Sequence, residues 1–384
     1  MAELNPALIP LSLYIHMPWC VKKCPYCDFN SHAVPDGKLS LELEQTYLNA
    51  LVEDFKTQVG FAQGRQIHSV FIGGGTPSLI SAKGYQWLFE QLKSILPFEE
   101  NCEITLEANP GTVEHDPFAG YLAAGINRLS LGVQSFNTNH LTRLGRIHNH
   151  HDAISAIQHA RDAGFQRINV DLMHGLPEQT LEQALHDLKL AVEQGATHIS
   201  WYQLTIEPNT VFFRTQPILP VDDVLEDIQE QGEAYLKANG FVNYEVSAWR
   251  KEKPSAHNLN YWQFGDYLAI GAGAHGKVTQ KNGVYRFQKT RLPKDYLAKV
   301  PAEHLQFKPI ADEDMPFEFM MNALRLNEGV DAKFYAERTG LNLNSLDELL
   351  TSLRERKLMI NDVNRLACTE QGHIFLNSVL EEFL

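Results

Sequence analysis

Three cysteines stand close together near the start of the chain, at Cys20, Cys24 and Cys27, directly after a short apolar segment. Thiolates are soft ligands, and three of them in one loop indicate a metal site. An iron–sulfur cube usually takes one cysteine on each of four irons, and a structural zinc takes four protein ligands, yet no fourth cysteine follows nearby. We therefore expect a [4Fe–4S] cluster with one open coordination position. The alternative is a zinc site completed by His16 or His32, although structural zinc prefers paired C-x-x-C motifs.

A second segment that can hold a ligand is the run Gly73-Gly74-Gly75-Thr76-Pro77, which follows another apolar segment. Glycines remove side chains, so a ligand can approach the backbone, and free amide and carbonyl groups can bind its charged atoms. The alternative is a bare tight turn. The run is not a P-loop, because no Gly-Lys-Ser/Thr follows.

These segments belong to a regular alternation of strand and helix patterns. The expected strands are residues 11–16, 69–72, 103–106, 128–133, 167–172 and 198–204, and the expected helices between them include 43–57, 85–95, 152–162 and 181–193. Strands joined through helices of this length run parallel with right-handed crossovers. Six in succession predict an α/β fold built on a partial (β/α)6 TIM-type barrel, with a doubly wound open sheet as the alternative.

Polar or glycine residues follow every predicted strand. The strands lead in turn to the cysteines, the glycine run, Glu107-Ala108-Asn109-Pro110, Gln134-Ser135, Asp171 with His174, and Thr205 with Glu207. Chemistry in such folds collects where the carboxyl ends of the strands meet. Loops are solvated, so any single polar residue there is ambiguous, but together they predict one functional rim.

The β-α repeat ends near residue 219, which divides the chain into three parts. We expect the barrel in residues 1–218, and in 219–308 an extension with a helix at 224–238, a strand at 242–248 and sheet and loop across 258–277. Residues 309–384 read as helices, a small hairpin of 358–361 with 365–367, and a last helix capped by Thr369. That order predicts a small winged-helix-like domain, acidic in charge, which favours a structural or docking role over DNA binding.

Composition excludes several classes of protein. The 384 residues carry a net charge of −14, which argues against nucleic acid as a partner because that affinity depends on clustered Lys and Arg. Cys102 and Cys368 lie far apart and read as buried apolar residues in a reduced compartment. Residues 1–10 lack a signal-peptide pattern, and no apolar stretch is long enough to span a bilayer. We expect a cytoplasmic protein and leave peripheral membrane contact and a homodimer open.

The cysteine spacing, with Tyr26 before the last thiol, resembles the radical S-adenosylmethionine (SAM) superfamily, in which the open iron binds SAM. The resemblance narrows to the oxygen-independent coproporphyrinogen-III oxidase family, and it covers nearly the whole chain. The segments that carry it are Tyr14–Cys20, Gly73–Pro77, Glu107–Pro110, Gly132–Phe136, Leu144–Arg146 and Asp171–Pro177.

The resemblance implies a role for each matched residue. Residues expected to contact SAM are Tyr14, Gly74, Gly75, Thr76 and Glu107, and those lining the position of a second SAM are Gln134, Arg146 and Asp171. The chemistry is reasonable, since a carboxylate can accept from an ammonium or ribose hydroxyl and Arg can fork onto a carboxylate. The structural alternatives are that Asp171 caps the next helix and that Arg146 pairs with Asp152.

One departure from the family pattern concerns Phe29. The decarboxylating enzyme has another cysteine two residues after the third cluster ligand, whereas this chain has Phe29, which cannot supply a proton, an electron or a thiyl radical. The lead before Tyr14 is also shorter than the enzyme's N-terminal arm. Both differences resemble the haem-chaperone branch of the family.

A further resemblance to that branch lies in His257-Asn258-Leu259-Asn260-Tyr261-Trp262. Imidazole is a common axial ligand of haem iron, and Tyr261 with Trp262 would offer flat apolar surface to a porphyrin. Spacing alone favours a structural interpretation, in which His257 caps a turn and Tyr261 and Trp262 pack into the extension sheet. The resemblance favours haem binding instead. For His275, in a second glycine-rich loop, we favour the structural interpretation.

Two hypotheses follow from the resemblance. In the first, the protein holds haem through His257, Asn258, Tyr261 and Trp262 and passes it to an acceptor, for which the resemblance implies a respiratory haem enzyme, while the cluster and SAM govern conformation, dimerisation or release. In the second, the protein is an enzyme that cleaves SAM to a radical acting on a porphyrinogen. Phe29 and the His257 motif favour the first, and no catalytic residue is assigned.

Overall fold

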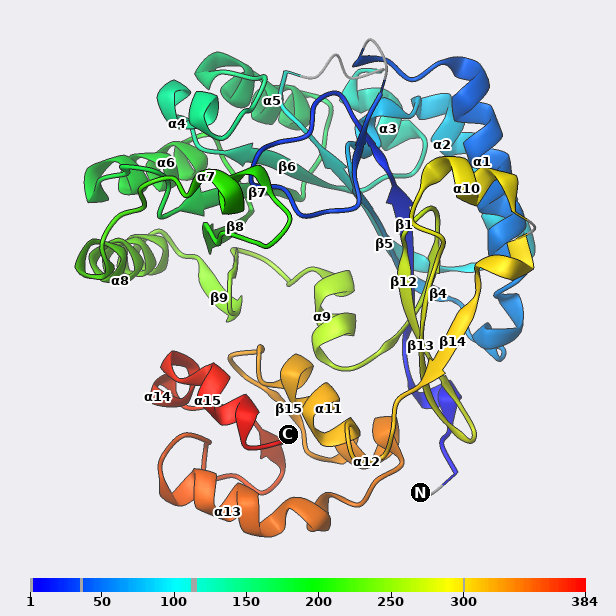
Figure 1. The fold of residues 1–384 in the computed structure, drawn as a ribbon, viewed down its shortest axis with the longest axis vertical. Helices are drawn as coiled ribbons and strands as arrows, with labels where there is room; N and C mark the ends of the chain where they lie inside the picture. Colours follow the sequence, from blue (N-terminus) through cyan, green and yellow to red (C-terminus); the bar gives the residue numbers. More distant parts are fainter. Residues whose placement is uncertain (1–2, 35–36, 112–115, 300) are drawn as a thin grey trace.

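The computed structural model describes residues 3–34, 37–111, 116–299 and 301–384, and a large central sheet dominates it (Figure 1). The sheet has 12 strands, and its inner six follow chain order and run parallel. These six are β1 (Leu11–Met17), β4 (Ile67–Gly74), β5 (Phe98–Ala108), β6 (Arg128–Gln134), β7 (Ile168–His174) and β8 (His198–Gln203). The partial barrel expected from the sequence is confirmed, and the strands begin and end within a few residues of their predicted positions.

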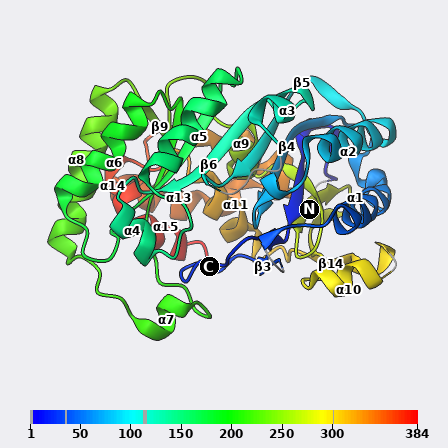
Figure 2. The same ribbon diagram turned by 90° about the horizontal axis from the view of Figure 1, so that it is seen from above.

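Helices pack on the outer face of this sheet. They are α1 (Leu41–Lys56), α2 (Ala82–Ile95), α3 (Phe118–Ala123), α4 (Thr138–Arg143), α5 (His150–Asp162), α6 (Leu181–Glu193) and α8 (Asp222–Ala238). Ser40 and Ser81 cap α1 and α2, and Thr180 starts α6 with a capping box, so each start is encoded locally. Figure 2 shows α1 and α2 at one side of the molecule and α6 and α8 at the other, with barrel strands between them.

Alternation along each strand separates apolar from polar side chains. In β1, Leu13 and Ile15 belong to the main hydrophobic core beneath the helices. Ser12, the residue before Leu13, bonds to Ser69 of β4 (Oγ to Oγ, 2.7 Å) on the other face. Because side chains alternate with period two, β1 carries apolar residues toward the helices and polar residues toward the inner face.

The extension closes both edges of the parallel sheet. At one edge β10 (Ala248–Arg250) pairs antiparallel with β8, followed by β9 (Val242–Glu245). At the other edge β11 (Asp266–Ile270) pairs parallel with β1, and β12 (His275–Gln280), β13 (Gly283–Gln288) and β14 (Gln306–Pro309) continue antiparallel. The predicted single strand 242–248 is wrong, because β9 and β10 are two antiparallel strands of one hairpin with a turn at residues 246–247.

The tract 258–277, predicted as sheet and loop, contains a helix. This helix, α9 (Ala256–Trp262), begins at Ser255, whose side chain accepts from the backbone N–H of Asn258. Glu103 of β5 accepts from the backbone N–H of Ala256 (2.9 Å), so a carboxylate from the barrel also satisfies the start of the helix. Because Ser255 and Glu103 both bind the free amides at the start of this helix, the aromatic motif lies on α9.

The C-terminal residues form a second hydrophobic core, drawn in orange and red in Figure 1. Its helices are α11 (Met315–Ala323), α12 (Lys333–Thr339), α13 (Asp347–Glu355), α14 (Glu370–Ile374) and α15 (Leu376–Glu381). In the predicted hairpin, Ile360 donates its N–H to the carbonyl of Ala367 (3.1 Å) and Met359 bridges Cys368, the residue after the second segment. β16 (Arg365–Leu366) pairs instead with β15 (Val330–Asp331). Thr369 caps α14 as predicted. Phe264 of the extension shares this core, and the division at residue 309 stays a proposal.

Candidate functional site

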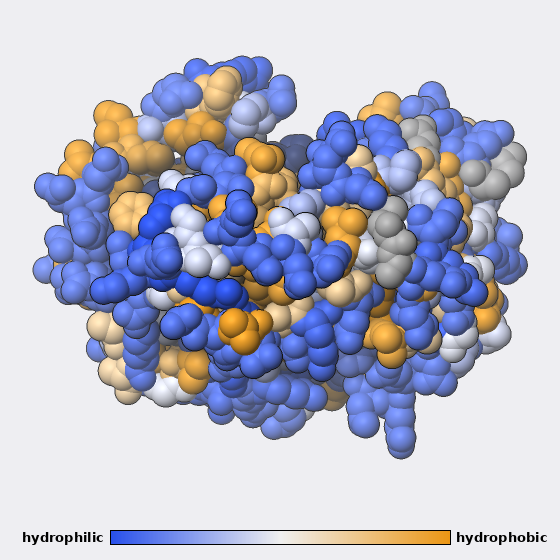
Figure 3. All heavy atoms as spheres, turned by 90° about the horizontal axis from the view of Figure 1, so that it is seen from below, coloured by the Kyte–Doolittle hydropathy of each residue, from blue (hydrophilic) through white to orange (hydrophobic). Residues whose placement is uncertain are grey.

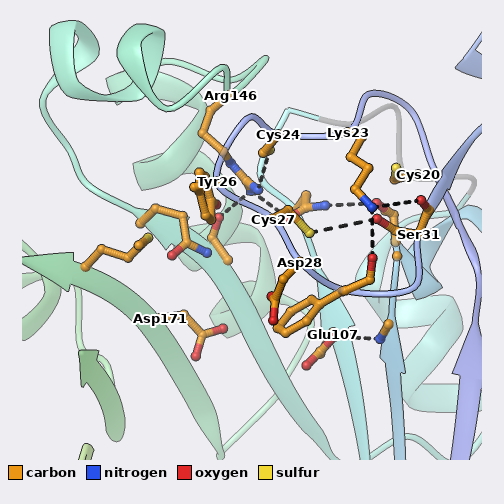
Figure 4. A pocket seen from close by; sticks show the side chains of 18 of the residues that line it. Cys20, Lys23, Cys24, Tyr26, Cys27, Asp28, Ser31, Glu107, Arg146 and Asp171 are labelled. Carbon is orange, nitrogen blue, oxygen red and sulfur yellow. Dashed lines mark hydrogen bonds between the residues drawn. The ribbon is translucent and has the colours of Figure 1, made fainter. Parts of the chain in front are cut away.

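The three cysteines lie on a loop at the mouth of the barrel (Figure 4). Cys20 ends the short strand β2 (Trp19–Cys20), which pairs with β3 (His32–Ala33) and closes the loop at its base. Lys23 extends across the loop and donates from Nζ to the carbonyl of Phe29 (2.9 Å). All three thiols face one cavity of about 470 Å³.

The arrangement of the thiols fits a cluster better than a single metal ion. Among the described residues, no three His, Cys, Asp or Glu side chains converge closely enough to hold one ion. A cube places a separate iron at each thiol, so it suits ligands that surround a space. His16 is also unsuited to zinc, because Nε2 donates to the carbonyl of Asn30 (2.9 Å) and Nδ1 therefore accepts from the Tyr14 hydroxyl (2.9 Å). No lone pair of His16 remains for a metal.

The glycine run packs against the strand that carries the first cysteine. Gly75 donates its N–H to the carbonyl of Met17, and a Cβ at Gly75 would lie 2.3 Å from the carbonyl oxygen of Trp19. Gly74 has a φ of +114°, which other residues rarely adopt. These glycines are therefore required for contact between the two loops, and both they and Thr76 line the cavity.

Two carboxyl groups, Glu107 and Asp171, face the cavity from β5 and β7. Burial, with a further contribution from the charge of Asp171, raises the pKa of Glu107 to about 8, although Gly74 donates its N–H to the carboxyl (3.2 Å). Burial likewise raises the pKa of Asp171, which accepts from Ser130 (3.0 Å) and Asn169 (2.7 Å). In the described part of the chain neither carboxyl has an ion-pair partner, so the pair suits a cationic ligand such as an ammonium or sulfonium group.

The two remaining predicted SAM residues of the inner wall make protein contacts. Gln134, which has a φ of +68°, accepts from the hydroxyl of Tyr202 (2.7 Å). Arg146 donates from one nitrogen to the Asn109 side chain (2.6 Å) and to the carbonyl of Gly132 (2.6 Å). The structural alternatives do not apply, since Arg146 is not paired with Asp152, which instead caps α5, and Asp171 caps no helix.

The sequence reasoning missed Tyr202, a cavity-lining residue of β8. The alternation of β8 could have predicted it, because Ser200 and Tyr202 are two residues apart on the strand and therefore share its inner face. Asn109 lines the cavity as well and donates to the hydroxyl oxygen of Thr76 (3.0 Å). The sequence places Asn109 at the end of a predicted strand but assigns it no binding role.

The structure brings together the residues predicted to bind the cluster and SAM except for Tyr14, which is not among the residues lining the cavity. The ring of Tyr14 lies beside Phe71, 6.4 Å between centroids, and its hydroxyl is committed to His16. Tyr14 therefore makes contacts within the protein, on β1 ahead of the cysteine loop. Its predicted contact with SAM stays a prediction.

His257 lies deep inside the molecule, away from the cavity. It is 3% exposed, its ring stacks on Phe71 at 4.8 Å, and Tyr261 meets it edge-on at 4.5 Å. Burial lowers the pKa of His257 to about 3, so the imidazole is neutral. Its Nδ1 is buried and has no hydrogen-bond partner among the described residues. A neutral imidazole with an unused nitrogen has the chemistry of a metal ligand but no open path to one.

The other motif residues place α9 between the barrel and the C-terminal helices (Figure 1). Trp262 packs against the C-terminal core, with the guanidinium of Arg325 4.4 Å from its ring centroid. Asn258 donates to the hydroxyl of Tyr244 (3.2 Å). None of the four predicted haem-binding residues lines the cluster cavity. The structure therefore separates the predicted haem motif from the predicted cluster and SAM residues.

Phe29 occupies the rim of the cavity. Its side chain is 60% exposed, and it lines both the cluster cavity and an adjoining groove that also includes Arg291 and Leu292. His275 lies on β12 and is exposed, which fits the structural interpretation given to its loop.

The surface gives little indication of a partner. Exposed large apolar side chains occur on the cluster loop and near α7 (Val211–Thr215), and others on the C-terminal helices: Phe29, Val211, Phe213, Leu292, Ile374 and Phe375. Figure 3 shows one face on which hydrophobic residues form small groups separated by hydrophilic ones. Among the described residues, no helix is both long and apolar enough to cross a membrane.

Comparison with known proteins bears on the whole chain. Residues 14–191 match the Radical SAM superfamily, and residues 310–375 match the HemN C-terminal domain. The chain is 50% identical over 386 residues to "Heme chaperone HemW" of Haemophilus influenzae, covering 99% of each chain. It is 48% identical over 379 residues to the protein of the same name from Escherichia coli, covering 98% of this chain and 99% of the other. Among solved structures, Escherichia coli coproporphyrinogen III oxidase (HemN) shares the fold, with a TM-score of 0.80, 24% identity, and coverage of 98% and 90%.

Proposed function

The chain belongs to the family of the heme chaperone HemW, within the radical SAM superfamily, and from this premise we propose that it binds haem and delivers it to an acceptor protein. The family membership carries this proposal, and Phe29 at the rim supports it, because a phenyl group cannot act as a proton donor or radical carrier there. The acceptor proposed from the resemblance is a respiratory haem enzyme, met in the cytoplasm or at a membrane surface.

The cavity is proposed to hold a [4Fe–4S] cluster and SAM. Cys20, Cys24 and Cys27 would ligate three irons and leave one for SAM, and such a cluster supplies one-electron chemistry when bound. The glycine loop would receive one end of SAM, and Glu107 would interact with a cationic group. Two buried carboxyl groups that form no ion pair among the described residues favour this assignment, since SAM carries both an ammonium and a sulfonium.

Haem is proposed to bind at His257 on α9, and the burial of that residue adds a condition. A planar macrocycle cannot reach an imidazole that is 3% exposed and stacked on Phe71, so α9 must move before iron can bind. The contact between Arg325 and Trp262 holds α9 against the C-terminal helices. We expect Arg325→Ala to speed haem association, because a cation–π contact of about 1 kcal/mol no longer opposes the movement.

The test is an anaerobic haem titration of reconstituted protein, followed by the Soret band. His257→Ala and His257→Phe, the second keeping a ring against Phe71, should each weaken haem binding at least tenfold. His68→Ala, at an exposed histidine on β4, is the matched control and should bind as the wild type does. Wild-type protein that gives no Soret change, yet converts coproporphyrinogen and releases methionine, would show that the protein is the enzyme and not the chaperone.

A further inference from the structure

Arg146 connects the cluster loop to the wall of the barrel. From Nη1 it donates to the sulfur of Cys24 (3.7 Å), and from Nη2 it donates to the side-chain oxygen of Asn109 and to the carbonyl of Gly132. Figure 4 shows the guanidinium lying between Cys24 and Tyr26, with dashed lines to its partners. One side chain thus joins a cysteine of the loop to the ends of β5 and β6.

The backbone beside Arg146 packs on the same loop. Gly145 has a φ of +68°, and a Cβ there would lie 2.6 Å from Cδ of Pro25, the residue after Cys24. Arg146 itself donates its backbone N–H to the carbonyl of Leu141 (2.9 Å), which fixes it to the end of α4. Two adjacent residues therefore contact two adjacent residues of the cluster loop, so the contact is part of the fold.

A ligand role alone does not account for this geometry. A guanidinium that binds the carboxylate of SAM bidentately presents two nitrogens to it. Here Nη2 is already shared between Asn109 and Gly132, and Nη1 is turned toward a thiol, so that only Nε is buried without a partner among the described residues. Asn109 in turn donates to Thr76 of the glycine loop, so Arg146 connects to both halves of the cavity.

We infer that Arg146 is a positioning residue, whose guanidinium donates to the Cys24 thiolate of the cluster and sets the cluster's reduction potential. The inference rests on the cluster proposed above. Hydrogen bonds to cluster sulfurs are among the factors that set the potential, since a donor and its positive charge stabilise the more negative, reduced form. Removing Arg146 should therefore make the cluster harder to reduce.

The experiment is a potentiometric titration of the reconstituted full-length protein, without SAM, followed by electron paramagnetic resonance of the reduced cluster. Arg146→Met removes charge and donors at similar length, and Arg146→Lys keeps the charge. In Arg146→Met the ratio of reduced to oxidised cluster at a fixed potential should fall about tenfold, equal to a shift of about 59 mV for one electron. Arg146→Lys should fall between it and the wild type.

Arg143→Met is the matched control, because Arg143 lies three residues earlier on α4 and pairs with Glu178 at the surface. Its potential should equal that of the wild type. Wild-type potential in both Arg146 variants, with weakened SAM binding, would overturn the inference and leave Arg146 as a SAM ligand alone. If Arg146→Met takes up no iron, Arg146→Lys decides: a lowered potential supports the inference and a wild-type potential overturns it. Wild-type protein without cluster iron and sulfide would overturn the proposed cluster itself.

Discussion

Replacing Glu107 with Gln should change how stability depends on pH. Burial raises the pKa of Glu107 from its ordinary value of 4.5 to about 8 in the folded protein. The folded state therefore binds a proton more tightly than the unfolded chain, and stability falls as pH rises between these values. Glutamine cannot ionise, so Glu107→Gln removes this loss.

The size of the effect follows from the two pKa values. In the unfolded chain the Glu107 carboxyl is mostly ionised by pH 5.5, whereas in the folded protein it is still protonated. The difference lowers the free energy of unfolding by about 1.4 kcal/mol at pH 5.5 and by about 4.6 kcal/mol at pH 8.5. Relative to wild type, Glu107→Gln should thus gain about 3 kcal/mol in free energy of unfolding over this range. Urea titrations of the chain without cluster or SAM, at both pH values, measure the difference.

Glu100→Gln is the control, because Glu100 is an exposed residue on the same strand. The difference in free energy of unfolding between Glu100→Gln and wild type should be the same at both pH values. An offset for Glu107→Gln that also stays constant would refute the reasoning, since it would mean that the carboxyl titrates normally. A cationic ligand beside Glu107 should lower its pKa again. Binding of SAM at pH 7 should then release close to one proton from wild type and fewer from Glu107→Gln, as measured by calorimetry in buffers of different ionisation enthalpy.

Two further substitutions test the cavity. Cys24→Ala should lose cluster iron and acid-labile sulfide while haem binding persists, because His257 lies outside the cavity, whereas Cys102→Ala, at a buried residue of β5, should keep both. Full iron and sulfide in Cys24→Ala would disprove the ligand assignment. Gly75→Ala should weaken SAM binding more than tenfold, because its Cβ would lie 2.3 Å from the carbonyl oxygen of Trp19, and Gly60→Ala, whose Cβ meets nothing within 4 Å, should bind SAM normally. Equal affinities in equilibrium dialysis would contradict this.

The barrel could be predicted from the sequence because its signals are local. The strands are short apolar runs, several helices begin at a cap such as Ser40 or Thr180, and chain order equals strand order in the six inner parallel strands. The rim followed from that topology, since parallel strands end on one edge. Glu107 and Asp171 were therefore found from their positions at strand ends, before any distance was known.

The position of the aromatic motif could not be predicted in the same way. His257 and its helix are held by Glu103 of β5, by Phe71 of β4 and, through Trp262, by Arg325 of the C-terminal region, and all three contacts come from far away in sequence. Composition indicates that such a segment is apolar and aromatic, but not which surfaces cover it. The same limit applies to Tyr14, whose hydroxyl is bonded to His16.

The pairing of β11 with β1 has a consequence for dissecting the molecule. β1 leads directly to the cysteines, and its outer edge is covered from Leu11 to Ile15 by a strand that the chain supplies only at residues 266–270. A fragment that stops at residue 218 would keep every cysteine of the loop yet leave a row of unsatisfied amides and carbonyls open to other molecules. Such a fragment should self-associate, and a soluble truncation needs to retain β11.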